Sequence, residues 1–253
     1  MADKRARVVI KLGTGILTKR THDGLDTGQF RRLSAEIATL VRAGTEMVLV
    51  TSGAVGAGLM HLKITERPSD LPSVQAAAAI GQSRLMGLYA SLFARHGLHV
   101  AQLLLTHQDL DSRTRCRNAR NTLERLMRFG NIVPIINEND SVVVEELKFG
   151  DNDFLSAEVA ILSQADLLII LTSVDGLLGE DGQVIPEVSN IDAVAGLARR
   201  ETGVYSRGGM VSKLQAAKLA VQAGIPVVIG SGLRPDVIKT AVDGGIVGTR
   251  FVP

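Results

Sequence analysis

Two clusters of carboxylate and carboxamide side chains, ten residues apart, could together bind a small polar ligand. The first cluster, residues 137–140 (NEND), directly follows an apolar run at residues 132–136, and the second is residues 150–153 (GDND). In an open sheet, groups at the carboxyl ends of strands converge on the ligand site. Carboxylates and amides in this arrangement suit a ligand that carries an ammonium group and other hydrogen-bonding atoms.

Two lysines beside glycine-rich turns have the chemistry of a phosphate site. Lys11 ends an apolar run just before a turn at residues 13–15, where an ammonium group and backbone N–H groups can meet one anion. Gly208 and Gly209 open a helical pattern that carries Lys213, and a helix N-terminus also attracts anions. Alone, Lys11 could extend into solvent, and the glycine pair could be a flexible turn. Together, the two lysines and two turns predict phosphoryl transfer.

Other motifs are incomplete or have ordinary explanations. There is no G-x-x-x-x-G-K-[ST] P-loop, and residues 53–58 read G-x-x-G-x-G, the reverse of the dinucleotide-binding order. Asp153 could simply cap a helix, although capping does not also explain residues 137–140. The histidines lack metal-ligand spacing, and no residue grouping suggests covalent catalysis. A solvated or subunit-contacting face, with an anion site as the alternative, is expected for Arg113, Arg115, Arg117, Arg120, Arg125 and Arg128.

The composition disfavours several classes of protein. Hydrophobic residues make up 45% of the chain, and 28 basic against 26 acidic residues give no reason to expect a nucleic-acid or membrane partner. Aromatic residues amount to 3%, which disfavours base stacking. Cys116 is the single cysteine, so no internal disulfide forms. Because a signal-peptide core and an apolar run of roughly 18 residues are also missing, we predict a soluble cytoplasmic α/β protein.

The elements that must position these residues alternate along the chain. Apolar runs predict strands at residues 8–12, 47–50, 100–105, 132–136, 167–171 and 227–229. Helical spacing predicts helices at residues 27–43 (capped by Thr27), 73–95, 118–128, 155–162 and 210–223, and residues 179–188 read as a hairpin excursion. Such alternation implies parallel strands with helices on both faces. Because no linker divides the chain, we expect one doubly wound domain over residues 1–253.

Five motifs together resemble those of the glutamate 5-kinases, within the amino-acid kinase family. They are KLGTG at 11–15, VTSGA at 50–54, INEND at 136–140, GDND at 150–153 and GGMVSK at 208–213. INEND with GDND is the specific combination, whereas KLG and TSGA recur across the broader family. The resemblance implies a three-layer αβα sandwich with a mainly parallel central sheet, an acceptor site in the N-terminal half and an ATP site in the C-terminal half.

The same resemblance implies roles for individual residues. Lys11 and Lys213 would contact the ATP phosphates and offset charge on the transferring group. Glutamate would be held by Ser52, Asp140 and Asn152, with Asp151 and Asp153 in support. The nucleotide pocket would be lined by Thr172 and Ser173 and closed by Arg207, Gly208, Gly209, Met210, Val211, Ser212 and Lys213. Ser173 stands where the family usually has aspartate, and the residues before Gly208 differ from the usual Gly-Thr.

The implied reaction is ATP-dependent phosphorylation of the side-chain carboxylate of L-glutamate, which gives L-glutamyl 5-phosphate and opens proline biosynthesis. That carboxylate is ionised at neutral pH, with a reference pKa of about 4.3, so it needs no general base. It needs in-line positioning and relief of repulsion between two anions, which lysines, Mg²⁺ and glycine N–H groups can supply. A carboxylate near the amino group, with Asp140 preferred, would favour a free α-ammonium group.

Two other functions remain open at this point. One is another phosphotransferase of the same family, acting on acetylglutamate, aspartate, carbamate or a nucleoside monophosphate. The other is a non-catalytic sensor that binds ATP and an amino acid. The resemblance further implies a homo-oligomer (dimer or tetramer), possible feedback inhibition by proline and glutamyl phosphate reductase as a possible partner. Many family members carry a C-terminal PUA domain, and this sequence stops about where it would begin, so we expect a kinase domain without one.

Overall fold

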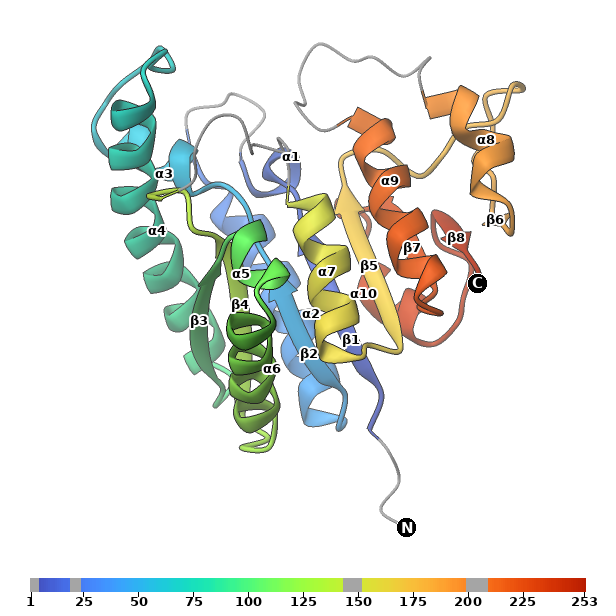
Figure 1. The fold of residues 1–253 in the computed structure, drawn as a ribbon, viewed down its shortest axis with the longest axis horizontal. Coiled ribbons are helices and arrows are strands. Elements are labelled where there is room, and N and C mark those ends of the chain that lie inside the picture. The colour runs from blue at the N-terminus through green and yellow to red at the C-terminus, as the bar shows by residue number, and fades with distance from the viewer. Residues whose placement is uncertain (1–4, 19–23, 143–151, 199–208) are drawn as a thin grey trace.

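A single mixed sheet organises the protein, as seen in a computed structural model that describes residues 5–18, 24–142, 152–198 and 209–253 (Figure 1). The sheet has eight strands in the order β3-β4-β2-β1-β5-β7-β8-β6. Their bounds are β1 Arg7–Leu12, β2 Glu46–Val50, β3 His99–Leu105, β4 Ile132–Glu138, β5 Leu167–Thr172, β6 Glu187–Val188, β7 Val227–Ser231 and β8 Thr249–Phe251. Every described pair of neighbours is parallel except β7 with β8.

Helices cover both faces of this sheet, which confirms the three-layer α/β/α class. The helices are α1 Thr14–Leu17, α2 Thr27–Arg42, α3 Ala54–His61, α4 Leu71–Ala94, α5 His107–Asp111, α6 Arg113–Met127, α7 Asp153–Ser163, α8 Ile191–Ala198, α9 Gly209–Gln222 and α10 Val237–Val242. One hydrophobic cluster joins α6, α7, α8 and α9 to one face, and a second joins α1, α2, α4 and α10 to the other. Consecutive β1 residues alternate between them, since Val9 lies in the first and Ile10 in the second.

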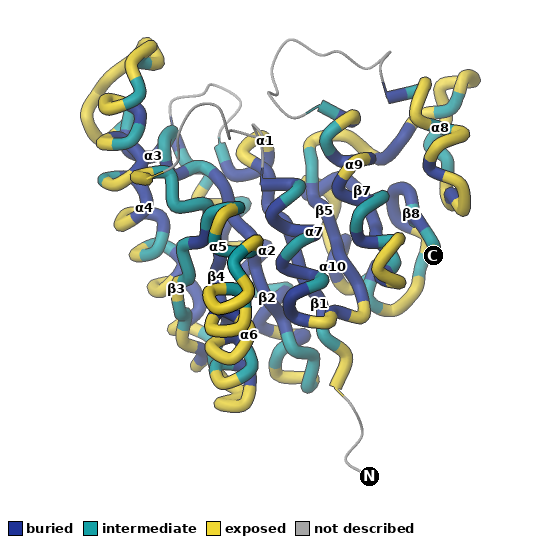
Figure 2. Tube along the Cα trace, in the orientation of Figure 1, coloured by how far each residue is buried: buried dark blue, intermediate teal, exposed yellow. Residues whose placement is uncertain are grey.

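Burial explains why the central strands are continuous apolar runs. In Figure 2 the central strands form a buried layer between the helices, whose outer faces are exposed. A strand covered on both faces has no solvent side to alternate toward. None of the described helices is long and apolar enough to cross a membrane. The six arginines between Arg113 and Arg128 are all exposed on or beside α6, as expected of a solvated face.

Several element boundaries differ from the sequence-based expectation. The helix α2 is capped by Asp26, whose carboxylate accepts a hydrogen bond from the Gln29 N–H at 3.0 Å, so the prediction that Thr27 caps it was wrong. Either residue type is a good cap, and here the helix begins one position earlier, so that Asp26 takes the N-cap position. β4 runs two residues further than expected, which places Asn137 inside the strand.

The glycine run at residues 53–58 serves helix packing. A Cβ atom on Gly58 would lie 1.8 Å from the Ala77 carbonyl oxygen, and one on Gly81 would lie 1.7 Å from the Ala54 carbonyl oxygen. Real side chains cannot occupy such positions, so α3 and α4 touch backbone to backbone at these two glycines. This contact holds α4 against α3, the helix that follows the loop after β2.

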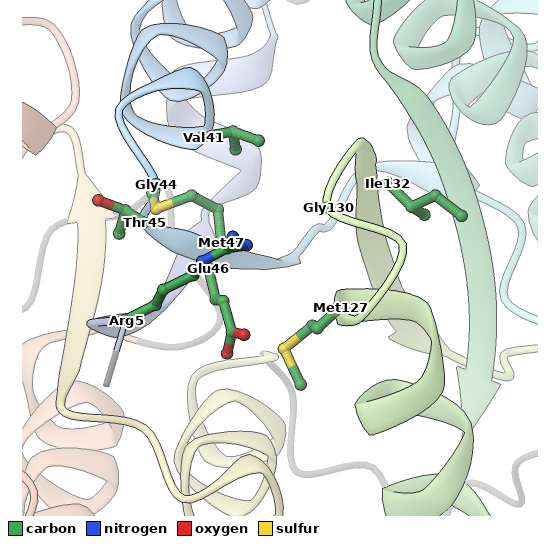
Figure 3. A pocket seen from close by; sticks show the side chains of 9 residues that line it. All are labelled: Arg5, Val41, Gly44, Thr45, Glu46, Met47, Met127, Gly130 and Ile132. Carbon is green, nitrogen blue, oxygen red and sulfur yellow. The ribbon is translucent and has the colours of Figure 1, made fainter. Parts of the chain in front are cut away.

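The amino ends of the strands carry a small pocket of about 20 Å³, roughly the volume of one water molecule. Figure 3 shows the side chains that line it, among them Arg5, Glu46 and Met127. Beside it, Arg7 binds two carboxylates, Glu46 at 2.8 Å and Glu124 at 2.7 Å, and donates to the Ser163 carbonyl oxygen. The charged groups of Arg7, Glu46 and Glu124 at these strand ends therefore pair with one another.

Candidate active site

Asp153 lies between two lysines at the carboxyl ends of the strands. Its Oδ1 is 2.6 Å from the Lys11 ammonium nitrogen, and its Oδ2 is 3.1 Å from that of Lys213. Ser212 donates a hydrogen bond to the same Oδ2 at 2.8 Å. Asp153 is 0% exposed, Lys11 1% and Lys213 5%. Lysine is almost never this buried without a partner, so the three residues form one unit.

The electrostatics of this unit keep Asp153 ionised. Burial alone would raise the pKa of Asp153, because it removes water from the carboxylate. The two ammonium groups and the hydrogen bond from Ser212 outweigh that effect, and the pKa is lowered below its ordinary value. The three charges sum to one positive charge, so the unit favours a further anion.

Each member of the unit comes from a different element. Lys11 lies near the end of β1, Asp153 is the first residue of α7, and Lys213 lies in the first turns of α9, where its Nζ also donates to the Gly209 carbonyl oxygen at 3.2 Å.

The capping interpretation of Asp153 was wrong. Asn152 holds the N-cap position, and no side-chain capping hydrogen bond is made there.

The loops after β1, β5 and β7 lie side by side at this edge. Gly13 N–H donates to the Leu171 carbonyl oxygen at 3.3 Å, and Gly232 N–H donates to that of Thr172 at 2.8 Å. A side-chain atom at Gly15 would lie 3.7 Å from Ser173 Oγ. Thr172 and Ser173 therefore lie next to the turn that follows Lys11.

The predicted anion-binding segment is described in part. Gly209 opens α9 with a φ of +23°, Met210 is buried, and Val211 is 43% exposed. Ser212 and Lys213 follow and bind Asp153. Arg207, Gly208 and Asp151 lie outside the described residues.

Asn152, the neighbour of Asp153 in the chain, is in direct contact with Ser52. The Asn152 Nδ2 group donates to the Thr51 carbonyl oxygen, to Ser52 Oγ at 3.2 Å and to Asn137 Oδ1 at 2.7 Å. Ser52 is 7% exposed, and Asn152 is 8% exposed. Asp140 lies in the turn after β4 and is half-buried. The structure thus places Ser52 in direct contact with Asn152, and Asn152 directly precedes Asp153 in the chain.

Sequence reasoning missed the polar side chains that support this region from α4. Gln82 accepts a hydrogen bond from Asn137 Nδ2 at 2.8 Å, and Tyr89 OH is 2.9 Å from Thr51 Oγ1. The available signal was their spacing: residues seven apart lie on one face of a helix, and this face is otherwise apolar.

Among the described residues, no group of three or more His, Cys, Asp or Glu side chains is arranged to hold a metal ion.

Comparison with known proteins identifies the family and relatives of the chain. The model of the amino acid kinase family matches residues 6–231. A protein named glutamate 5-kinase from Pelobacter propionicus is 47% identical over 257 residues, covering 99% of this chain and 68% of the relative. Another glutamate 5-kinase, from Moorella thermoacetica, is 48% identical, covering 98% of this chain and 67% of the relative.

Solved structures of lower identity share the fold. Carbamate kinase from Giardia lamblia bound to AMP-PNP superimposes with a TM-score of 0.70 at 18% identity, covering 98% of both chains. UMP kinase from Bacillus anthracis gives 0.63 at 17% identity, covering 97% of this chain and 95% of that one. These two likenesses confirm the αβα architecture.

Proposed function

Because the chain belongs to the amino acid kinase family, we propose that it transfers a phosphoryl group from ATP to the side-chain carboxylate of L-glutamate. The product is L-glutamyl 5-phosphate, and the reaction is the first step of proline biosynthesis. The observation that carries this proposal is the buried Lys11–Asp153–Lys213 unit, in a chain 47% identical to a glutamate 5-kinase.

The two lysines would relieve the repulsion between donor and acceptor. Both reactants are anions, and phosphoryl transfer depends mainly on positioning and charge stabilisation. Lys11 and Lys213 approach the same carboxylate from two elements, so Asp153 holds two ammonium groups close together that would otherwise repel each other. We place Lys11 and Lys213 in the catalytic role and Asp153 as the residue that positions them.

The nucleotide would lie over the loops that follow β1, β5 and β7. Thr172 and Ser173 would line its pocket, and Gly209, Met210, Val211, Ser212 and Lys213 would close over the phosphates. Arg207 and Gly208 belong to the same proposal, although they lie outside the described residues. The positive charge of the unit and the N-terminus of α9 both favour phosphate at this place.

Mg²⁺ would accompany ATP. It commonly binds through one or two carboxylates together with substrate phosphates and waters. The only carboxylate within the described lysine unit, that of Asp153, is already bound to both lysines. We therefore expect the ion to be held chiefly by phosphate oxygens and water. When bound, it would neutralise charge on the phosphates.

The acceptor would bind on the side of Asn152 and Ser52. Asp140 would pair with its α-ammonium group, Ser52 and Asn152 would also contact the bound glutamate, and Asp151 and Asp153 would support the site. The attacking carboxylate is already ionised at neutral pH, with a reference pKa of about 4.3. The carboxylate therefore needs correct positioning but no general base, whereas a hydroxyl acceptor would need one.

Several finer proposals rest on the family resemblance alone. They are assembly as a dimer or tetramer, inhibition by proline, transfer of the labile product to a glutamyl phosphate reductase and a cytoplasmic location. A pull-down with the reductase and a coupled assay test the third of these. No contact and no gain in rate would contradict it.

The decisive experiment is Mg²⁺-dependent ADP release with L-glutamate, with the product trapped by hydroxylamine. We expect γ-glutamyl hydroxamate with L-glutamate, and none with N-acetylglutamate or aspartate. Turnover with a different acceptor alone would favour another phosphotransferase of the family. Binding of ATP and glutamate without ADP release would favour the non-catalytic sensor.

A further inference from the structure

Four carboxamide side chains form a continuous hydrogen-bonded row behind the proposed acceptor site. Asn152 Nδ2 donates to Asn137 Oδ1 at 2.7 Å, and Asn137 Nδ2 donates to Gln82 Oε1 at 2.8 Å. Gln82 Nε2 then donates to Gln102 Oε1 at 3.1 Å. Asn152, Asn137 and Gln82 are at most 9% exposed, whereas Gln102, on the edge strand β3, is exposed.

Two backbone groups set the direction of this row. The Thr51 carbonyl oxygen can only accept a hydrogen bond, so Asn152 must turn its NH₂ group toward it. The Glu138 N–H can only donate, so Asn137 must turn its Oδ1 toward it, at 3.0 Å. With both amides oriented in this way, Asn137 Nδ2 faces Gln82, and Gln82 must present its carbonyl oxygen.

The row leaves one atom of Asn152 for a ligand. Its Nδ2 group faces three acceptors, the Thr51 carbonyl oxygen, Ser52 Oγ and Asn137 Oδ1. No hydrogen bond within the described part of the chain involves its Oδ1. A carbonyl oxygen can only accept, so Asn152 can recognise an N–H donor. On the proposed acceptor, L-glutamate, the N–H donor is the α-ammonium group.

We propose that Gln82 is a positioning residue for acceptor recognition: through Asn137 it holds the Asn152 amide so that Oδ1 faces the α-ammonium group of the acceptor. This inference rests on the proposed function and adds a specificity device to the same site. Without Gln82, Asn137 Nδ2 loses its acceptor, and the Asn137 amide is no longer held at both ends. Asn152 then has less to oppose rotation of its own amide.

The fold brings Gln82 to this place through its neighbour. Gly81 lets α4 touch the Ala54 carbonyl oxygen of α3, so the next residue along α4 reaches past α3 to the end of β4. Tyr89, two turns further along the same face, binds Thr51. Thus α4 supports both ends of the contact between Asn152 and the β2–α3 loop.

The test compares Gln82→Met with the same substitution at the exposed end of the row, Gln102→Met. Isothermal titration calorimetry measures the dissociation constants of L-glutamate and of glutarate, the same dicarboxylate without the ammonium group. We expect Gln82→Met to reduce the glutarate-to-glutamate ratio of dissociation constants about tenfold, as fits one lost hydrogen bond to a charged group. The affinity for ATP should stay at the wild-type value, and Gln102→Met should leave the ratio unchanged.

A conservative variant separates positioning from general damage to the fold. Gln82→Glu keeps an oxygen for Asn137 Nδ2, and the exposed Gln102 can rotate to donate to the other, so most of the ratio should return. Equal weakening of glutamate, glutarate and ATP in Gln82→Met, or an unchanged ratio, overturns the inference. If Gln82→Met does not fold, Gln82→Asn, whose amide is too short to reach Asn137, replaces it with the same expected loss.

These outcomes can be told apart from a failure of the proposed function. Calorimetry reads binding directly and needs no turnover. A wild-type chain that binds glutamate more tightly than glutarate, yet releases no ADP, would refute the proposed reaction and leave the role of Gln82 testable. A wild-type chain without that preference would refute the inference, whatever the hydroxylamine assay shows.

Discussion

The two ends of the parallel strands carry charge clusters of opposite composition. At the carboxyl ends an anion, Asp153, lies between two cations, and at the amino ends a cation, Arg7, lies between two anions. The Asp153 side chain is 0% exposed and the Arg7 side chain 13%, while its partners Glu46 and Glu124 are 20% and 35% exposed. Each cluster joins elements that are far apart in sequence.

The difference lies in the sum of the charges. The three side chains of the Asp153 cluster sum to one positive charge and lie beside the loops that follow three parallel strands, where ligands bind in this class of sheet. The Arg7 cluster keeps a net negative charge, and its guanidinium also donates to the Ser163 carbonyl oxygen. Burial lowers the pKa of Arg7, but its hydrogen bonds and ion pairs with Glu124 and Glu46 outweigh this and raise it. We infer that the first cluster serves chemistry and the second serves stability.

The inference that the Asp153 cluster serves chemistry is tested most directly by removing Lys213. We expect Lys213→Ala to lower kcat by about 10²–10³-fold, the usual cost of one group that stabilises transition-state charge. KM for glutamate should change little, since the proposed acceptor site lies beside Asn152. Steady-state kinetics with the hydroxylamine trap measure both constants. Wild-type kcat in this variant would remove Lys213 from the mechanism.

The reverse prediction applies to Arg7. We expect Arg7→Met to lower the free energy of unfolding by about 2 kcal/mol, because it leaves two part-buried carboxylates without their partner. The value is small for a cluster of this size because water can reach Glu46 and Glu124. Urea denaturation measures the loss. A fall in kcat without a fall in stability would contradict the assignment.

A pH series sharpens the comparison at Asp153. Its pKa is lowered in the folded protein, so its stabilising contribution is full above the unfolded-state pKa of about 3.9. That contribution is lost as pH falls through the folded-state pKa. The stability difference between the wild type and Asp153→Asn should be constant at neutral pH and shrink in strong acid. A difference that grows in acid would contradict the two-lysine arrangement.

The smallest expected effect concerns Glu36, a half-buried carboxylate on α2 that has a long ion pair with Arg32. Burial raises its pKa, although it accepts backbone hydrogen bonds from Lys239 and Ile238 at 2.9 and 2.7 Å and lies 3.6 Å from Arg32. Above the folded-state pKa, the ionised Glu36 side chain therefore lowers the free energy of unfolding. Glu36→Gln keeps the accepting oxygen and should stabilise the protein at pH 7 by up to about 1 kcal/mol.

The matching control for Glu36 is the same comparison at low pH. Below the unfolded-state pKa of about 4.3, the wild-type side chain is mostly neutral in both states, so most of the advantage of Glu36→Gln should disappear. Urea denaturation at pH 7 and pH 4 measures it. An advantage that persists at pH 4 would show that charge is not the cause.

Much of this could be predicted from the sequence, for identifiable reasons. The core strands were visible because burial on both faces leaves uninterrupted apolar runs, as at residues 167–171. β8 was missed because three residues of an antiparallel strand carry no periodicity. Lys11 and Lys213 were singled out by the glycine turns beside them, and the structure brings both to Asp153, while their role at a phosphate site stays a prediction.

The site details that escaped prediction depend on partners far away in sequence. Asp153 begins a helix, so its residue type fits both a cap and an ion pair, and only the approach of Lys11 and Lys213 decides. Gln82 looked like an ordinary residue of an alanine-rich helix, because its partner Asn137 lies 55 residues away. Arg7 gave no signal for the same reason: its three side-chain contacts come from β2, α6 and the end of α7.

The antiparallel strand β8 has a consequence for how the protein is made on the ribosome. Among the described strands, β6 pairs only with β8. Residues 187–188 leave the ribosome long before residues 249–251, so β6 has no partner in the sheet until β8 is made. The nascent chain therefore exposes the outer edge of β7 until β8 is synthesised. Unpaired strand edges are templates for wrong pairing between chains. β8, which is made after both of its neighbours in the sheet, thus covers an edge at which copies of the newborn chain could pair.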